Sequence, residues 1–254
     1  GRQYYRMAES LSVRWADALI ADADGIAEYY DDEFGAPTEL IAYGAPIQES
    51  PASDLLAGLG LSPQSYHLVV ARFEPENHVL EIVRGYVASQ AKLPLIVVGS
   101  APYSDEYTAA VKAAANDDRI QLVGGVWDQD LLDQLYANAA SYLHGHSVGG
   151  TNPSLLRAMG AGTTVIAWDV SFNRGVLGEA GLFFDTDAAL VEELAQTETE
   201  LAVNRPAWQA RASQLQDRAR TNYDWDDVAD TYGQLAHRLA ERSVSRPKLS
   251  GRRR

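Results

Sequence analysis

Short runs of apolar residues recur along the chain, and most of them do not alternate with polar residues. Continuous apolar runs are typical of strands that are covered on both faces, as in parallel sheets. The pattern predicts eight strands, at ALIA (18–21), ELIAY (39–43), HLVVA (67–71), PLIVVG (94–99), IQLVG (120–124), SYLHG (141–145), TTVIAW (163–168) and GLFF (181–184).

The segments between these runs carry apolar residues at helical spacing. Two such stripes are Val79, Ile82, Val83, Tyr86 and Val87, and Leu131, Leu132, Leu135 and Tyr136. Strands that alternate with helices predict βαβ units, and hence an α/β fold with a Rossmann-like, doubly wound parallel sheet. After about residue 187 the pattern is helical to the end.

A domain boundary is expected near Gly44-Ala45-Pro46, where the helical and strand patterns give way to a loop. Residues 1–45 hold too few elements for a core of their own, so we interpret them as the end of another Rossmann-like domain and a crossover. Residues 46–223 are expected to form one complete domain. Residues 224–254 are expected to form a last helix, capped by Asp224 and lying against the N-terminal piece, and a basic tail.

Composition excludes several classes of protein. The 254 residues include no cysteine, which excludes disulfides, thiolate metal sites and a cysteine nucleophile. The net charge of −14 argues against a nucleic-acid partner. No apolar run approaches the roughly 20 residues of a membrane span, and the N-terminus does not resemble a signal peptide, so we expect a cytoplasmic protein. The tail RPKLSGRRR (246–254) predicts either a solvated segment or a peripheral contact with anionic lipid.

Two predicted strands end in unusual loops, at the sheet edge where α/β proteins bind ligands. The first loop is ARFEPENH, in which Arg72 directly follows a strand and precedes a helix that is expected to start near Glu76. An arginine beside a helix N-terminus suits a phosphate group. The alternative is a surface ion pair of Arg72 with Glu74 or Glu76.

The second loop is HGHSVGGTNPSLL, which carries Gly145, Gly149 and Gly150 before a helix. Pro153 suits the first helical turn, and Asn152 or Thr151 suits the N-cap. Glycines let main-chain N–H groups approach a ligand closely, and the helix start adds partial positive charge. The loop therefore predicts a cradle for a diphosphate, although plain helix packing is the simpler alternative.

Other chemistry is not expected from the remaining motifs. His144 and His146 flank a glycine, but no third ligand is evident, so we expect no metal. A serine hydrolase would need a G-x-S-x-G elbow, which is absent. Asp185 and Asp187 are expected to cap the helix near residue 188.

At these loops the chain resembles glycosyltransferase family four, which has the GT-B fold, and within it the branch of capsular-polysaccharide rhamnosyltransferases. The resemblance runs from about Glu9 to Tyr232. It rests on RWADALIADADGIAEYY, ELIAYGAP, ARFEPENH, GHSVGGTNPSLL and WDVSFN, of which HSVGGTNPSLL is the most specific.

The resemblance implies a retaining transferase that moves a sugar from a nucleotide-diphosphate sugar to a glycan or lipid-linked acceptor, without a metal or other cofactor. Arg72 would contact the diphosphate and stabilise the leaving group, and Val126 and Trp127 would lie near the base. The other residues implied to bind the nucleotide sugar are Asn77, His146, Gly149, Gly150, Thr151, Asn152 and Arg157.

Three positions depart from the family pattern. Asn77 stands where the wider family has a lysine, Arg157 where it has a ribose-binding glutamate, and Gly175 where it often has another glutamate. A guanidinium only donates hydrogen bonds, so Arg157 would pair with phosphate rather than with ribose. A non-catalytic nucleotide-sugar-binding module, a sugar-nucleotide epimerase or phosphorylase, and a flavodoxin-like regulator remain as alternatives. We expect the 254-residue chain to bind donor weakly and to transfer nothing alone.

Overall fold

A computed structural model describes residues 2–101 and 104–241. The chain divides into two compact units, residues 1–44 with 223–254, and residues 45–222. The basic tail, with Arg246, Lys248 and Arg252–Arg254, lies outside the described residues. Among the described helices, none is both long and apolar enough to cross a bilayer.

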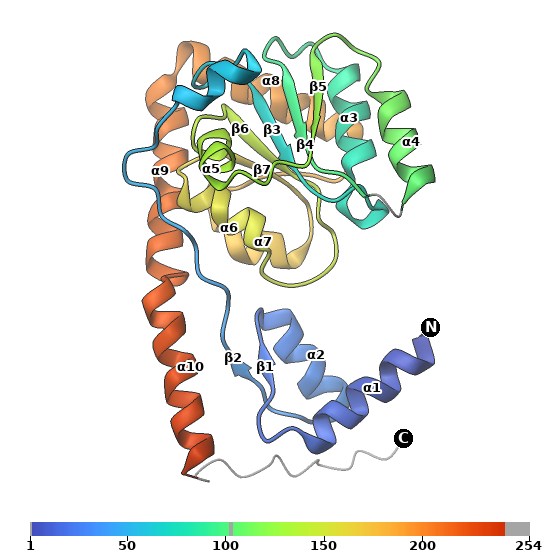
Figure 1. The fold of residues 1–254 in the computed structure, drawn as a ribbon, viewed down its shortest axis with the longest axis vertical. Coiled ribbons are helices and arrows are strands. Elements are labelled where there is room, and N and C mark those ends of the chain that lie inside the picture. Colours follow the sequence, from blue (N-terminus) through green and yellow to red (C-terminus); the bar gives the residue numbers. More distant parts are fainter. Residues whose placement is uncertain (1, 102–103, 242–254) are drawn as a thin grey trace. The chain divides into compact units, whose positions relative to one another are not determined.

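The unit of residues 45–222 is built on a six-stranded parallel sheet (Figure 1). Its strands are β3 (His67–Val70), β4 (Leu95–Val98), β5 (Ile120–Gly124), β6 (Ser141–His144), β7 (Val165–Trp168) and β8 (Leu182–Phe184). Their order across the sheet is β5-β4-β3-β6-β7-β8. The chain moves outward from β3 in one direction and then, from β6, in the other. The crevice between β3 and β6 is therefore the switch point of a doubly wound sheet, where such sheets bind ligands.

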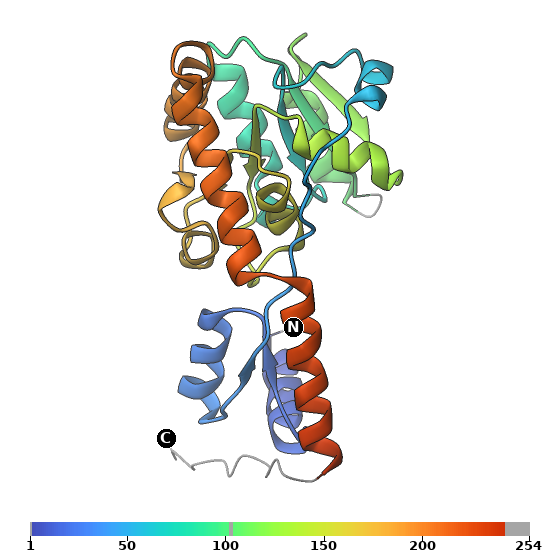
Figure 2. The same ribbon diagram turned by 90° about the vertical axis from the view of Figure 1, so that its left-hand side faces the viewer.

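Helices cover this sheet in two layers, because the connections after β3 and β4 and those after β5 and β6 lie on different faces (Figure 1). α3 packs against α4 and α8, while α6 packs against α5 and α9. Figure 2 shows the long α9 from the side. These helices are α3 (Val79–Ala88), α4 (Asp105–Ala114), α5 (Gln129–Ala137), α6 (Pro153–Gly160), α7 (Ser171–Leu177), α8 (Asp187–Val203) and α9 (Arg205–Asn222). Three short 3-10 helices, η1 (Asp54–Leu59), η2 (Pro75–Asn77) and η3 (Gly178–Ala180), complete the unit.

The predicted apolar stripes form the core of this unit. α3 buries Val79, Ile82, Val83 and Tyr86 against the sheet and α8, whereas Val87 at the end of the stripe is exposed. α5 buries Leu132, Leu135 and Tyr136 in the same way. The α/β fold with a doubly wound parallel sheet is confirmed, and every predicted apolar run contains one of the observed strands.

The smaller unit contains α1 (Arg2–Trp15), β1 (Ile20–Ala21), α2 (Asp24–Phe34), β2 (Glu39–Leu40) and α10 (Trp225–Ala240). β1 and β2 pair in parallel, and α10 contributes an ion pair at 2.9 Å between Arg238 and Glu39. The side chain of Asp224 caps α10 by accepting from Asp226 N and Asp227 N, as predicted. Leu235 of α10 is buried, whereas Trp225 and Tyr232 are exposed.

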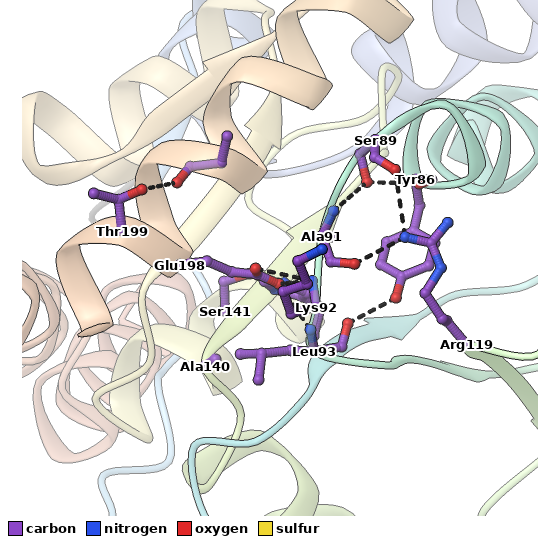
Figure 3. A network of polar contacts seen from close by, with 12 residues as sticks. Tyr86, Ser89, Ala91, Lys92, Leu93, Arg119, Ala140, Ser141, Glu198 and Thr199 are labelled. Carbon is purple, nitrogen blue, oxygen red and sulfur yellow. Dashed lines mark hydrogen bonds and ion pairs between the residues drawn. The ribbon is translucent and has the colours of Figure 1, made fainter. Parts of the chain in front are cut away.

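A cluster of polar contacts around Glu198, here called the polar clamp, lies at the amino ends of the central strands (Figure 3). Glu198 on α8 accepts hydrogen bonds from Lys92 N and Leu93 N, just before β4, and contacts His67 Nε2 on β3 at 3.2 Å. The other ring nitrogen of His67 bonds Ser141 Oγ on β6 at 2.8 Å. Burial opposes ionisation of Glu198, but the bonds from His67 and the two amides outweigh it and lower its pKa.

The N-terminus of α8 corrects one prediction. Its N-cap is Thr186, whose hydroxyl accepts from Ala189 N, and neither Asp185 nor Asp187 fills that position. Thr186 has the extended backbone of a cap, whereas Asp187 is already helical. A carboxylate in the first turn still favours the helix through the positive end of its dipole.

Candidate functional site

A cavity of about 450 Å³ lies at the carboxyl ends of β3, β4 and β6. Both unusual loops contribute to it, together with the segment after β5. Six of the residues that the sequence singled out line it: Arg72, Asn77, Val126, Trp127, His146 and Asn152. The two loops therefore meet at one cavity on the switch-point edge of the sheet.

Arg72 stands two residues beyond the end of β3 at the wall of this cavity. Its side chain is 70% exposed and lies 3.8 Å from Glu74, so the alternative ion pair is present as well. Glu74 is 17% exposed, but an ion pair of this length with an exposed arginine contributes little to stability, about 1 kcal/mol or less. The guanidinium can therefore exchange Glu74 for a more strongly charged phosphate without a large loss.

The Pro-Glu-Asn turn after Arg72 is held by its own side chains. Asn77 is buried, and its Nδ2 donates to the carbonyl oxygen of Arg72 at 2.9 Å. This turn is η2, and α3 begins at Val79, slightly later than the predicted start near Glu76. The short side chain of Asn77 thus fixes the turn that carries Arg72.

The loop after β6 approaches the same turn closely. A Cβ atom on Gly145 would lie 2.1 Å from the carbonyl oxygen of Asn77, so only glycine fits there. Ser147 N donates to the carbonyl oxygen of Glu76 at 2.9 Å, and Ser147 Oγ donates to it at 3.1 Å. These contacts tie the two loops together.

The start of α6 is capped as predicted, with Pro153 in the first turn and Asn152 at the N-cap. Asn152 Oδ1 accepts from Ser154 N at 2.9 Å and from Ser154 Oγ at 2.7 Å. Proline has no N–H group, so Pro153 offers no donor to an anion at this helix start. Within the described part of the chain, the N–H groups of Gly149 and Gly150 donate no hydrogen bond.

Gly149, Gly150 and Thr151 do not themselves line the cavity, although Val148 and Asn152 on either side of them do. Thr151 is buried, and Gly149 has a φ of 108°, in the region that favours glycine. The segment therefore bends around the cavity rim in a conformation that other residues would resist.

Arg157 does not reach the cavity. It lies on α6, but its Nε is 2.8 Å and its Nη2 2.7 Å from Asp133 Oδ1 on α5. Nη2 also donates to Gln129 Oε1 at 3.0 Å. The predicted binding role of Arg157 thus lacks geometric support, because its guanidinium joins α6 to α5 instead.

Two imidazoles stack at the cavity, with His146 among its lining residues. The rings of His144 and His146 are 4.4 Å apart and nearly parallel. Burial, together with the nearby His146, holds the pKa of His144 well below its usual value. Burial, with Arg72 and His78, lowers the pKa of His146 to about 4. Both rings are therefore neutral at pH 7, and no cluster of metal-ligating side chains occurs in residues 2–101 and 104–241.

Trp127 is an exposed apolar side chain at the edge of the cavity. It follows β5, its side chain is 88% exposed, and it lines the cavity beside Gly125 and Val126. Exposure of a whole indole is costly in water, so this side chain is suited to cover a flat ligand group.

The cavity wall also contains residues that the sequence did not predict as ligand-binding, among them Gly99, Ser100 and Glu76. Gly99 and Ser100 follow β4 and form part of the wall, and Glu76 lies within the turn after Arg72. A Gly-Ser pair at the end of the run PLIVVG was the available signal for the first two. Of the two predicted partners of Arg72, Glu74 and Glu76, the observed ion pair uses Glu74.

A protein-family model described as "Glycosyl transferases group 1" matches residues 65–202, which is more than half of the chain. A second model, for a domain of unknown function, matches residues 1–46. The chain is also 28% identical over 155 residues to the O-antigen chain mannosyltransferase B of Escherichia coli. That match covers 58% of this chain and 40% of the relative.

Similar solved structures include sucrose-phosphate synthase from Thermosynechococcus elongatus, with a TM-score of 0.74 and 23% identity. The likeness covers 93% of this chain and 61% of that one. Anabaena HepE in complex with UDP has a TM-score of 0.75 at 18% identity, over 93% of this chain and 67% of that one. These likenesses confirm the GT-B type of fold. The chain spans less than two thirds of the mannosyltransferase and of the synthase.

Proposed function

Because the chain belongs to the group 1 glycosyl transferases, we propose that its cavity binds a nucleoside-diphosphate sugar and that the protein transfers this sugar to an acceptor. One observation carries the proposal. Arg72 and Asn152 at the start of α6, which come from different strand ends, line one cavity at the β3/β6 crevice. A guanidinium and a helix start together favour a ligand with concentrated negative charge.

The proposed ligand extends across the carboxyl ends of the strands, from β5 toward β6. The base lies against Trp127 after β5, and the diphosphate lies between Arg72 after β3 and the start of α6 at Asn152. UDP in the HepE structure, and UDP-glucose in another structure of that protein, support a nucleotide sugar as the ligand class.

The proposed reaction breaks the bond between the anomeric carbon and the diphosphate, while the oxygen of an acceptor hydroxyl forms a new bond to that carbon. The hydroxyl proton passes to the departing diphosphate. Negative charge grows on the departing nucleotide. Arg72 stabilises it, because a fixed donor at the site of developing charge lowers the barrier. The protein supplies this charge from its own side chains, so we propose a transfer without metal or other cofactor.

The resemblance to the rhamnosyltransferase branch supports rhamnose as the sugar, with retention at the anomeric carbon. The O-antigen mannosyltransferase relative supports a glycan or lipid-linked acceptor and a role in polysaccharide biosynthesis. We assign the reaction to the bacterial cytoplasm, with contact at the inner membrane face when the acceptor is lipid-linked. Since the chain spans 40% of that relative, we propose that it binds donor alone but needs further residues for transfer.

A nucleotide-sugar-binding module without turnover is the second candidate, favoured by the ion pair that holds Arg157 to Asp133 and away from the cavity. Transfer of radiolabelled rhamnose from its dTDP donor to a lipid extract by the longest protein that contains this sequence would overturn it.

Calorimetry tests the binding proposal. UDP, dTDP and GDP are titrated into the chain in the presence of EDTA, with the three nucleosides as controls. At least one diphosphate is expected to bind at least tenfold more tightly than its nucleoside. Failure of all three diphosphates to bind would overturn the proposed function.

A further inference from the structure

Glu76 is the one acidic residue among the described residues that line the cavity. Its position is fixed by the backbone: its carbonyl oxygen accepts from Ser147 N and Ser147 Oγ, and the next residue, Asn77, is buried. Glu76 therefore sits on a braced turn, at the junction of the loops after β3 and β6.

The carboxylate of Glu76 has no hydrogen bond or ion pair to any other described residue. Its neighbour Glu74 is the residue that pairs with Arg72. A carboxylate in a cavity that receives a diphosphate repels that group, so its presence needs another explanation. Ionised carboxylates only accept hydrogen bonds, and the hydroxyl groups of a sugar are donors that match them.

The surrounding loop offers no competing acceptor of this kind. Residues 144–160, which include the glycine-rich segment and α6, contain neither aspartate nor glutamate. Arg157 on that helix is bound to Asp133, away from the cavity. A hydroxyl-rich ligand group at this end of the cavity thus finds one carboxylate, on the turn after β3.

The position along the sheet separates Glu76 from the proposed base site. Trp127 follows β5, and the contacts of Glu76 are to the loop after β6. Because Glu76 itself follows β3, the order β5-β4-β3 puts two strand spacings between the strand ends that carry Trp127 and Glu76, about 9–10 Å. That span suits an extended nucleotide sugar with its base at one end and its sugar at the other.

We propose that Glu76 binds the hydroxyl groups of the transferred sugar and so determines which donor sugar the cavity accepts. The inference rests on the proposed function. It distinguishes two parts of one ligand: Glu76 attracts the sugar and repels the diphosphate.

The test compares each nucleoside diphosphate with its sugar ester, using UDP and UDP-glucose, dTDP and dTDP-rhamnose, and GDP and GDP-mannose. The pair that binds the wild-type chain most tightly is then measured with Glu76→Gln, which keeps the shape of the side chain and removes its charge. Glu106→Gln, an exposed glutamate on α4 in the same unit, controls for the loss of one negative charge.

Glu76→Gln is expected to weaken binding of the sugar ester at least tenfold, and to leave binding of the diphosphate alone unchanged or up to threefold tighter. Glu106→Gln is expected to change neither. An equal loss for both ligands, or no loss for either, would overturn the role of Glu76 while leaving the binding function intact. A wild-type chain that binds none of the six ligands would overturn the proposed function and this inference with it.

Discussion

Arg157 on α6 is held by Asp133 on α5, with 2.7 Å between Nη2 and Oδ1. The pair joins two helices of one layer, and Gln48 Nε2 donates to the same carboxylate oxygen at 3.1 Å. Arg157, for which the resemblance implied a binding role, thus connects two helices in this structure.

Substitution Arg157→Glu is expected to destabilise the larger unit, because it sets a second carboxylate beside Asp133. The expected loss in unfolding free energy is about 1–2 kcal/mol, since the pair is partly exposed. Urea unfolding measures it. Adding Asp133→Asn to this variant should restore most of the lost stability. An Arg157→Glu variant as stable as the wild type would contradict the role of the ion pair.

The second prediction concerns the close contact at Gly145, where a Cβ atom would lie 2.1 Å from the carbonyl oxygen of Asn77. Gly145→Ala must push apart the loops after β3 and β6, with a loss of about 1–3 kcal/mol. Gly58→Ala is the matched control, because a Cβ atom there meets nothing within 4 Å. Equal melting temperatures for the two variants would show that the loops are not in close contact.

The fold could be predicted from the sequence because its strands are covered on both faces. A strand such as Leu95–Val98 is buried throughout and reads as an unbroken apolar run. The cap at Asn152 was also predictable, since an asparagine before a proline marks a helix start. The strand order required the structure, because each strand's neighbours are set by long-range packing.

The site could be predicted only in part, for a physical reason. Arg72 and Asn152 follow strand ends, and the topology of a parallel sheet brings such ends to one edge. The direction of a long side chain depends on its neighbours in space. Arg157 turns toward Asp133, which is 24 residues away in sequence, and no local pattern reveals that partner.

The stacked pair of His144 and His146 predicts a dependence of stability on pH. Burial lowers both pKa values, that of His146 to about 4, whereas an unfolded histidine titrates near 6.5. Below about pH 6.5 the unfolded chain therefore binds more protons than the folded chain does. The free energy of unfolding falls as the pH drops through this range. Each buried histidine contributes a slope of up to about 1.4 kcal/mol per pH unit.

Urea unfolding between pH 7.5 and 5.0 measures this effect. Carboxylates with lowered pKa values, such as Asp117 at about 2 and Glu198, lose their contribution at lower pH and do not interfere. His146→Asn should reduce the slope of unfolding free energy against pH, because only one buried histidine then takes up a proton on unfolding. A stability that does not change across this range would contradict the burial of the two rings.

The clamp at Glu198 predicts a local contribution to stability. Glu198→Gln weakens the acceptor for Lys92 N and Leu93 N and the contact with His67, with an expected loss of about 1–3 kcal/mol. Glu192→Gln, exposed on the same helix, is the control and should change stability by less than about 0.5 kcal/mol. Indistinguishable unfolding curves for the two variants would show that the contacts of Glu198 do not stabilise the fold.

Calorimetric titration of the tightest-binding nucleoside diphosphate into Arg72→Ala tests the central claim most directly. Arg84→Ala is the matched control, since Arg84 is exposed on α3 and lies outside the cavity. We expect Arg72→Ala to weaken binding at least tenfold and Arg84→Ala to change it less than twofold. Wild-type affinity in Arg72→Ala would contradict the claim that this guanidinium and the start of α6 hold one diphosphate.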